Sequence, residues 1–265
     1  MNRSYRRGIL GGMPQNIVGD AATVVILRDA SGPAGETRVE VLLLERPGRG
    51  SFAGAWAFPG GRVDPEDALP QDALPDGAKL SFEGGGAGSA DDGGASPQPA
   101  PVAARRAAVR ETFEETGLGL QEEAIVDLSC WVPPQEAKKR LRTWFFLAAD
   151  PGGDVVLNVG EHVAFVWIAP AVALARHAVG EMTLFPPTWV TLHGLLGAEA
   201  SVLAIADAAS REPELFESLQ LYAEDGRIEA VLWAGDAQYG NEAAQGPARH
   251  RLQIGKLPWA YERRD

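Results

Sequence analysis

Three glutamates stand close together in the stretch "AVRETFEETGLGL", which runs from Ala108 to Leu120. In a helix, Glu114 and Glu115 each lie within about 60° of Glu111 around the helix axis. Like charges at this spacing repel by about 0.2–0.5 kcal/mol a pair. Mg²⁺ or Mn²⁺ prefers carboxylate oxygens, would remove this repulsion and can also bind phosphate oxygens. The spacing therefore predicts a divalent-metal site.

The helix that carries these glutamates is predicted over "VAARRAAVRETFEETG", residues 102–117. We expect its face opposite the glutamates to anchor it to the core through Val102, Val109 and Phe113. Gly117 is placed to end the helix as a left-handed cap. The side chains between the glutamates are too small to screen their charge: Ala104, Ala107 and Ala108.

An acidic helix face can simply be solvated, so "ExxEE" alone does not establish a site. The surrounding residues favour a site, because a glycine loop, "FPGGRVDPED", lies upstream. Together they resemble the Nudix box, the signature of the Nudix hydrolase family. That signature is Gly, five residues, Glu, seven residues, then Arg-Glu-apolar-any-Glu-Glu-any-Gly-apolar. Gly61 with Asp67 matches the first part, and "RETFEETGL", Arg110–Leu118, matches the second.

The sequence departs from the signature at three points. Asp67 stands where the signature has Glu, and Thr112 stands where it has an apolar residue. The 42 residues between Asp67 and Arg110 replace the signature's seven. Most belong to a segment, 69–101, that is dominated by Gly, Ala, Pro, Asp and Ser, and we predict that it is a disordered insertion. Lengthening a flexible loop this much costs on the order of 1.5 kcal/mol, so the two halves of the box can still meet.

The resemblance implies roles for the residues of the box. Glu111, Glu114 and Glu115 would bind Mg²⁺ or Mn²⁺ together with the main-chain carbonyl of Gly60. Arg110 lies on the flank of the acidic face and would orient a carboxylate rather than bind the substrate. These five residues form the centre of the predicted catalytic site.

Other candidates lie outside the helix. Glu161, in "GEHVAF", occupies a position where Nudix relatives often have an acidic residue that binds metal or acts as a general base, although it can also be an ordinary loop glutamate. Arg46, at the end of a predicted strand, could bind phosphates with its planar guanidinium or point into solvent. Gly61 is assigned to substrate binding. The densest basic cluster, "EAKKRLR", either binds a polyanionic substrate or forms a solvated hairpin tip; its basic residues are Lys138, Lys139, Arg140 and Arg142.

The interrupted box, with "LRTWFFLA", "GEHVAFVWIAPAVALA" and "LFPPTW", resembles the Nudix branch that includes the peroxisomal coenzyme A diphosphatase. This implies hydrolysis of coenzyme A or an acyl-coenzyme A to 3′,5′-ADP and a 4′-phosphopantetheine. ADP-ribose, a dinucleotide or a nucleoside triphosphate is an alternative substrate. A non-catalytic, nucleotide-sensing module is an alternative of another class, but such a module does not need to keep three repelling glutamates.

Hydrophobic patterns predict the elements that position these residues. "AATVVILR" and "VEVLLLERP" predict strands buried on both faces, and a short strand is expected at Trp56 to Phe58. Further strands are predicted in "AIVDLSCWV", "LRTWFFLAA" and "HVAFVWI", and helices in "PAVALARHAVG" and "PPTWVTLHGLLG". The expected fold class is α/β, a Nudix α/β/α sandwich with a mixed sheet.

The chain divides into three predicted parts: an N-terminal segment, 1–19, a Nudix hydrolase domain, 20–198, and a C-terminal extension, 199–265, that packs on the domain. In the extension, "SVLAIADAASREPELFESLQLY" predicts more helix, and "RIEAVLWAG" and "RHRLQI" predict two strands.

Composition limits the possible partners and compartment. A formal net charge of −12 makes a nucleic-acid partner unexpected, and the resemblance to Nudix hydrolases implies a small-molecule nucleotide substrate. The single cysteine, Cys130, excludes an internal disulfide and is predicted to be a buried apolar residue. Because no apolar run approaches the roughly 20 residues of a membrane span, we expect a cytoplasmic protein. The sequence leaves monomer and homodimer equally open.

Overall fold

The computed structural model describes residues 17–32, 36–48, 53–68, 100–241 and 243–264. The predicted disordered insertion, 69–101, lies outside the described residues except for its last two. The predicted N-terminal segment, 1–19, lies outside them up to residue 16.

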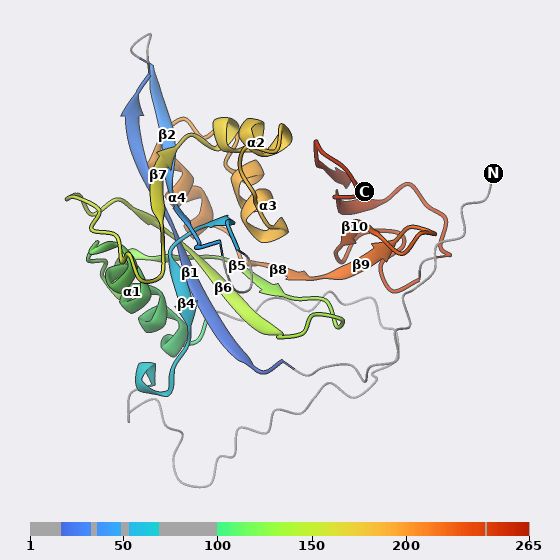
Figure 1. The fold of residues 1–265 in the computed structure, drawn as a ribbon, viewed down its shortest axis with the longest axis horizontal. Coiled ribbons are helices and arrows are strands. Elements are labelled where there is room, and N and C mark those ends of the chain that lie inside the picture. The colour runs from blue at the N-terminus through green and yellow to red at the C-terminus, as the bar shows by residue number, and fades with distance from the viewer. Residues whose placement is uncertain (1–16, 33–35, 49–52, 69–99, 242, 265) are drawn as a thin grey trace, which may run out of the picture.

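A mixed eight-stranded sheet forms the centre of the molecule (Figure 1). Its main path runs β3-β2-β1-β6-β5-β8, with β4 paired to β1 and β7 paired to β2. The β1–β6 and β5–β8 pairs are parallel, and the others are antiparallel. The strands are β1 (Gly19–Ser31), β2 (Thr37–Glu45), β3 (Trp56–Ala57), β4 (Gly60–Arg62), β5 (Val126–Val132), β6 (Leu141–Ala149), β7 (Ala164–Ile168) and β8 (Glu214–Glu217).

Both faces of this sheet are buried, as the apolar runs of the first two strands predict. Along β1, Val25 and Leu27 point into one core cluster, and Val24 and Ile26 point into the other. Helices cover the two faces: α1 (Val102–Thr116) lies on one side, and α2 (Pro170–Ala178), α3 (Pro186–Gly194) and α4 (Ser201–Ala209) lie on the other (Figure 1). The predicted α/β/α sandwich with a mixed sheet is therefore confirmed.

The expected anchoring face of α1 is wrong for two of its three residues, since only Val109 packs, partly buried, against the core. Val102 and Phe113 are exposed, at 45% and 60% of their surface, whereas the small side chains Ala104, Ala107 and Ala108 are buried against the sheet. Small side chains let the helix backbone approach the strands closely, and a phenylalanine at those positions would hold it away. The face that carries Glu115 consequently turns toward the sheet. Gly117 ends the helix at φ 72°, which confirms the left-handed cap.

The C-terminal extension contains more strand than predicted. Only Ser201–Ala209 is helical, and "ELFE" and "LQLY" form strands rather than helix. Pairing with β5 outweighs the helical preference of the Glu- and Leu-rich sequence of β8. A second, four-stranded antiparallel sheet follows in the order β12-β11-β10-β9, formed by β9 (Leu219–Tyr222), β10 (Ile228–Leu232), β11 (Arg249–Gln253) and β12 (Ala260–Arg264).

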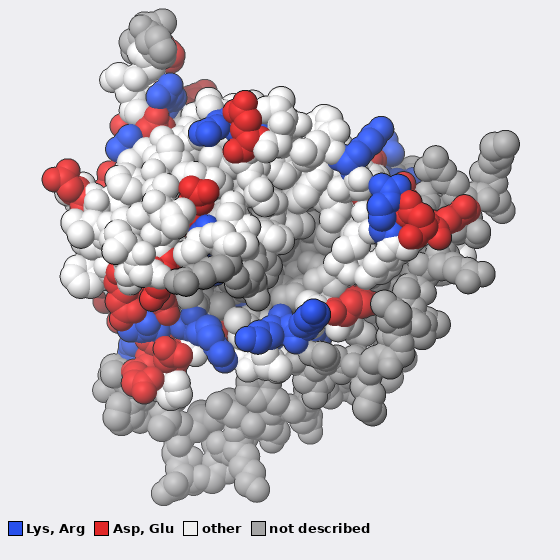
Figure 2. All heavy atoms as spheres, viewed as in Figure 1, with Lys and Arg blue, Asp and Glu red and all other residues white. Residues whose placement is uncertain are grey.

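Charged residues of both signs surround a hollowed, uncharged centre on the face shown in Figure 2. Among the described helices, none has the length and apolar composition needed to cross a membrane. Cys130 is 2% exposed within a core cluster, as predicted.

Candidate functional site

The two glycines of β4 bring the glycine loop and helix α1 into direct contact. The Gly60 N–H donates a hydrogen bond to Glu115 Oε2 at 2.8 Å. A Cβ on Gly60 would lie 2.2 Å from Ala22 O, so only glycine fits beside β1. A Cβ on Gly61 would lie 2.3 Å from the carboxyl carbon of Glu111. Gly61, predicted to bind substrate, thus makes room for a glutamate of the box.

Glu115 is a buried carboxylate, 4% exposed, with other acidic groups around it. Burial, assisted by the Glu111 and Glu161 carboxylates, raises its pKa to about 8, although the Gly60 N–H and the charge of Arg46 act in the opposite direction. Burial also raises the pKa of Glu111. Buried carboxylates of this kind gain most from a bound cation, which favours the charged form of each.

A loop between β6 and β7 brings further side chains to Glu115. The Asn158 N–H donates to the Glu115 carbonyl at 3.0 Å, and the Val163 N–H donates to the Glu45 carbonyl at 3.0 Å. The residues between these two anchors are therefore held between the C-terminal turn of α1 and the end of β2.

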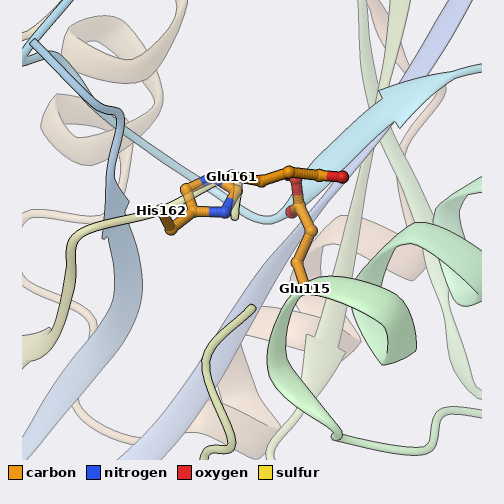
Figure 3. Close-up of side chains that lie close together, drawn as sticks. All are labelled: Glu115, Glu161 and His162. Atoms are coloured by element: carbon orange, nitrogen blue, oxygen red, sulfur yellow. Dashed lines mark ion pairs between the residues drawn. The ribbon is translucent and has the colours of Figure 1, made fainter. Parts of the chain in front are cut away.

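Glu161 and His162 lie in this anchored segment and converge with Glu115 (Figure 3). One possible ligand atom from each of the three lies within 4.8 Å of the others. His162 Nε2 is 3.6 Å from Glu115 Oε1. Burial, and to a lesser extent the charge of Arg46, lowers the pKa of His162 to about 4, so the ring is neutral near pH 7. Sequence reasoning missed His162, although "GEHVAF" places it directly after Glu161.

Arg110 connects the two halves of the interrupted box. Its Nε and Nη2 donate to Oδ1 and Oδ2 of Asp67, both at 2.9 Å, and its Nη1 donates to Glu111 at 3.0 Å and Glu114 at 3.2 Å. Asp67 is 5% exposed and also accepts the Asp64 N–H at 2.8 Å. The shorter carboxylate that departs from the signature thus fixes Arg110, and Arg110 in turn fixes two glutamates of α1.

The predicted ligands therefore fall into two sets. Glu115 and Glu161 belong to the group with His162, whereas Glu111 and Glu114 are paired with Arg110. Glu114 is the more exposed of this pair, at 52% of its side chain against 14% for Glu111. Gly60 contacts Glu115 through its N–H, whereas the group predicted to bind the metal ion is the Gly60 carbonyl.

The predicted substrate-binding arginines differ in their surroundings. Arg46 acts on Glu115 and His162 through its charge and so faces the acidic group. Arg140 is 8% exposed and donates to the Pro133 carbonyl. Arg142 forms a two-fold ion pair with Asp20.

Arg140 thus bonds across the β5–β6 hairpin, and Arg142 connects β6 to β1, so both guanidinium groups already have partners within the protein. Lys138 and Lys139 are exposed at the tip of this hairpin.

A cavity of about 560 Å³ lies away from these residues, on the sheet face covered by α3 and α4. Its lining includes Ser129, His193 and Arg263, and it contains none of the predicted site residues. We therefore place the candidate site at Glu115 and not in this cavity.

The donor set around Glu115 suits a divalent cation. It combines carboxylates with an imidazole that makes no hydrogen bond to the described residues, and both are metal ligands in proteins. The positive charge of Arg46 and the nearby glycine backbone would also allow an anionic group to bind beside the Glu115 group.

Comparison with known proteins supports the fold. No family model and no curated protein matches the sequence. The solved Nudix hydrolase from Alicyclobacillus acidocaldarius matches with a TM-score of 0.55 at 22% identity, covering 72% of this chain and 96% of that chain. A MutT Nudix hydrolase from Burkholderia pseudomallei and an Ap4A hydrolase from C. elegans match with TM-scores of 0.41 and 0.36, at 20% and 22% identity, each covering 66% of this chain and 95% of the other. The first of these matches shows that the chain has the fold of a Nudix hydrolase.

Proposed function

We propose that this protein is a divalent-metal-dependent Nudix hydrolase that cleaves the diphosphate of a nucleoside diphosphate linked to another group. The observation that carries the proposal is the buried Glu115 carboxylate, held by the Gly60 N–H beside Glu111, Glu161 and His162. A bound cation would account for this grouping, because the charged form of the buried Glu115 carboxylate, whose pKa is raised to about 8, opposes folding unless a cation compensates it.

In this proposal, Glu115 and Glu161 bind Mg²⁺ or Mn²⁺, with Glu111 and Glu114 as further ligands and Arg110 as the residue that orients them. A bound ion of this kind neutralises the diphosphate and lowers the pKa of a bound water. Arg46 would hold a phosphate oxygen by its charge.

The attacking water needs a base, and we assign this part to the Glu161 carboxylate oxygen that does not bind the ion, because Glu161 is the exposed carboxylate of the group around Glu115. Glu161 would take a proton from the water, whose oxygen adds to one phosphorus while the bridging P–O bond breaks. Each product then keeps one of the two phosphates of the former diphosphate.

For the substrate we propose coenzyme A or an acyl-coenzyme A, cleaved to 3′,5′-ADP and a 4′-phosphopantetheine. The resemblance of the interrupted box and of "LFPPTW" supports this choice, and Lys138 and Lys139 are two exposed cations that could meet a 3′-phosphate. ADP-ribose, a dinucleotide or a nucleoside triphosphate is the alternative within the same chemistry.

The test is a mass-spectrometric product screen with Mg²⁺ or Mn²⁺ that offers coenzyme A, an acyl-coenzyme A, ADP-ribose, NADH and nucleoside triphosphates. Glu114→Gln, at a half-exposed position, runs in parallel and should lose activity without unfolding. A Lys138→Ala/Lys139→Ala protein should raise KM for coenzyme A more than for dephospho-coenzyme A.

Three outcomes separate the alternatives. Cleavage of coenzyme A that Glu114→Gln abolishes supports both the chemistry and the substrate. Cleavage of another substrate keeps the chemistry and removes coenzyme A. Turnover of none of them favours a nucleotide-sensing module, and equal turnover by Glu114→Gln removes the assigned catalytic site.

A further inference from the structure

His162 occupies a costly position for an ordinary core residue. Its side chain is 5% exposed, and its Nδ1 is buried without a hydrogen-bond partner among the described residues. A buried polar group left unsatisfied costs about 1–3 kcal/mol, and because Nε2 is the atom that faces Glu115, a ligand bound there would offset this cost without itself satisfying Nδ1. The His162 N–H is bonded to the Asn158 carbonyl at 3.0 Å, which fixes the main chain at this position in the anchored loop.

The contact between His162 and Glu115 is not a hydrogen bond. The separation of Nε2 from Oε1 is 3.6 Å, beyond the usual 2.7–3.2 Å of an N–H···O bond. Two ligands bound to one ion at roughly 2.1 Å, at the angles of a tetrahedron or an octahedron, are about 3.0–3.4 Å apart. The two atoms thus stand closer to the spacing of two ligands on one ion than to that of a donor and its acceptor.

Glu161 completes the arrangement from the solvent side. It is exposed, whereas Glu115 and His162 are buried, so an ion held by all three would lie at the border between the protein and water. Such an ion could take further ligands from solvent or substrate.

We propose that His162 is a metal ligand, which together with Glu115 and Glu161 makes this an N,O site selective for transition-metal ions such as Mn²⁺ over Mg²⁺. Mg²⁺ takes oxygen ligands, whereas an imidazole nitrogen favours first-row transition-metal ions, whose affinity rises from Mn²⁺ to Cu²⁺. An all-carboxylate site has no such bias. The inference rests on the proposed function for the location of the site, but it concerns the identity of the ion.

The test measures binding without substrate, on the full chain, with Mn²⁺ as the probe. Pulsed electron paramagnetic resonance of the Mn²⁺-loaded protein should show coupling to an imidazole ¹⁴N, and His162→Gln should remove it. His193→Gln is the matched control, because His193 stacks on Trp189, away from the acidic group. In calorimetric titrations, the unsubstituted protein should bind Mn²⁺ at least about tenfold more tightly than Mg²⁺, and His162→Gln should reduce this ratio.

Each outcome decides the proposal. Absence of ¹⁴N coupling in the unsubstituted protein overturns it, and this result does not depend on whether the variant folds. Coupling that persists in a folded His162→Gln protein also overturns it. If coupling is found but no substrate is hydrolysed, the metal assignment stands and the proposed function fails. If a substrate is hydrolysed but no coupling is found, the proposed function stands and the metal assignment fails.

Discussion

The contact between Gly61 and Glu111 gives a sharp test of how the glycine loop supports the site. Gly61→Ala would place a Cβ 2.3 Å from the Glu111 carboxyl carbon, whereas ordinary contacts begin at 3.4 Å. The carboxylate must therefore move by more than about 1 Å, a displacement that can reduce an enzyme's rate about 100-fold. This corresponds to about 2.7 kcal/mol of lost transition-state stabilisation.

The fold should tolerate this substitution. Gly61 does not have a positive φ, and the atoms that meet the new Cβ are the end of a flexible side chain. Thermal unfolding should consequently change little while Mn²⁺ affinity and turnover fall. Gly119→Ala is the matched control, because a Cβ at Gly119 meets nothing within 4 Å and Gly119 lies just beyond α1.

A double-mutant cycle asks whether the effect passes through Glu111. In a Glu111→Gln background, Gly61→Ala should cause much less additional loss, since the displaced group no longer carries the charge. Metal affinity can be followed by calorimetry even if the natural substrate is unknown. Unchanged affinity and rate in Gly61→Ala, or losses that simply add in the double variant, would refute the assigned contact.

Two further predictions concern stability. Gly60 has φ 151°, and Gly60→Ala would place a Cβ 2.2 Å from the Ala22 carbonyl oxygen, a main-chain atom that cannot rotate away. The free energy of unfolding should therefore fall by about 3 kcal/mol in a urea titration. Gly54→Ala is the control, because Gly54 has φ 67° but its Cβ would meet no neighbouring atom, so its loss should be clearly smaller; equal losses would show that the clash plays no part. Asp236 forms a buried ion pair with Arg251. Burial raises the pKa of the Asp236 carboxyl, but hydrogen bonds from Arg251 and from two main-chain N–H groups outweigh this effect and hold that pKa below its usual value. The stability that the charged Asp236 contributes to the folded protein is present above the unfolded-state pKa of about 3.9, and it is lost as pH falls through the lower folded-state pKa. Asp236→Asn should therefore destabilise the protein by about 3 kcal/mol at pH 7 and by less at pH 2, while the exposed Asp225→Asn should have little effect; a pH-independent loss would contradict this explanation.

The sandwich could be predicted because its signals are local. Strands such as β1 are apolar on both faces, and Gly117 and the proline at the start of α3 mark helix ends. β8 was missed because its residues favour helix in isolation, and only the partner strand β5, far away in sequence, makes it a strand.

The candidate site was predicted in part. The spacing of Glu111, Glu114 and Glu115 identified the helix, but it does not show which face of the helix turns inward, and that depends on the small alanines that pack on β1. The role of Asp67 could not be predicted, because it depends on the contact with Arg110, which lies on the other side of the insertion. The position of His162 directly after Glu161 is a weak signal in the sequence, and its proximity to Glu115 depends on the loop anchored to α1.

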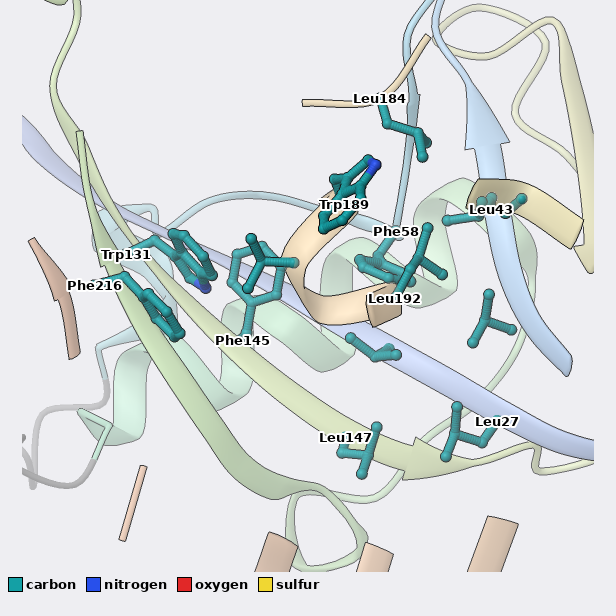
Figure 4. Packing of buried hydrophobic residues seen from close by; sticks show 14 of the residues in the cluster. Leu27, Leu43, Phe58, Trp131, Phe145, Leu147, Leu184, Trp189, Leu192 and Phe216 are labelled. Carbon is teal, nitrogen blue, oxygen red and sulfur yellow. The ribbon is translucent and has the colours of Figure 1, made fainter. Parts of the chain in front are cut away.

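The parallel pairing of β8 with β5 has a consequence for synthesis of the protein. Trp131 and Phe216 stack with ring centroids 3.9 Å apart, and both lie within the core cluster shown in Figure 4. About 80 residues separate these strands, so at about 5–20 residues per second β5 waits roughly 4–16 seconds for its partner during translation. In that interval the edge of β5 has no partner strand, and the side chain of Trp131 is exposed to solvent. The growing chain thus needs protection from aggregation at the edge of β5. The supply of chaperones should affect the yield of this folded protein more than the yield of a protein whose edge strand is made first.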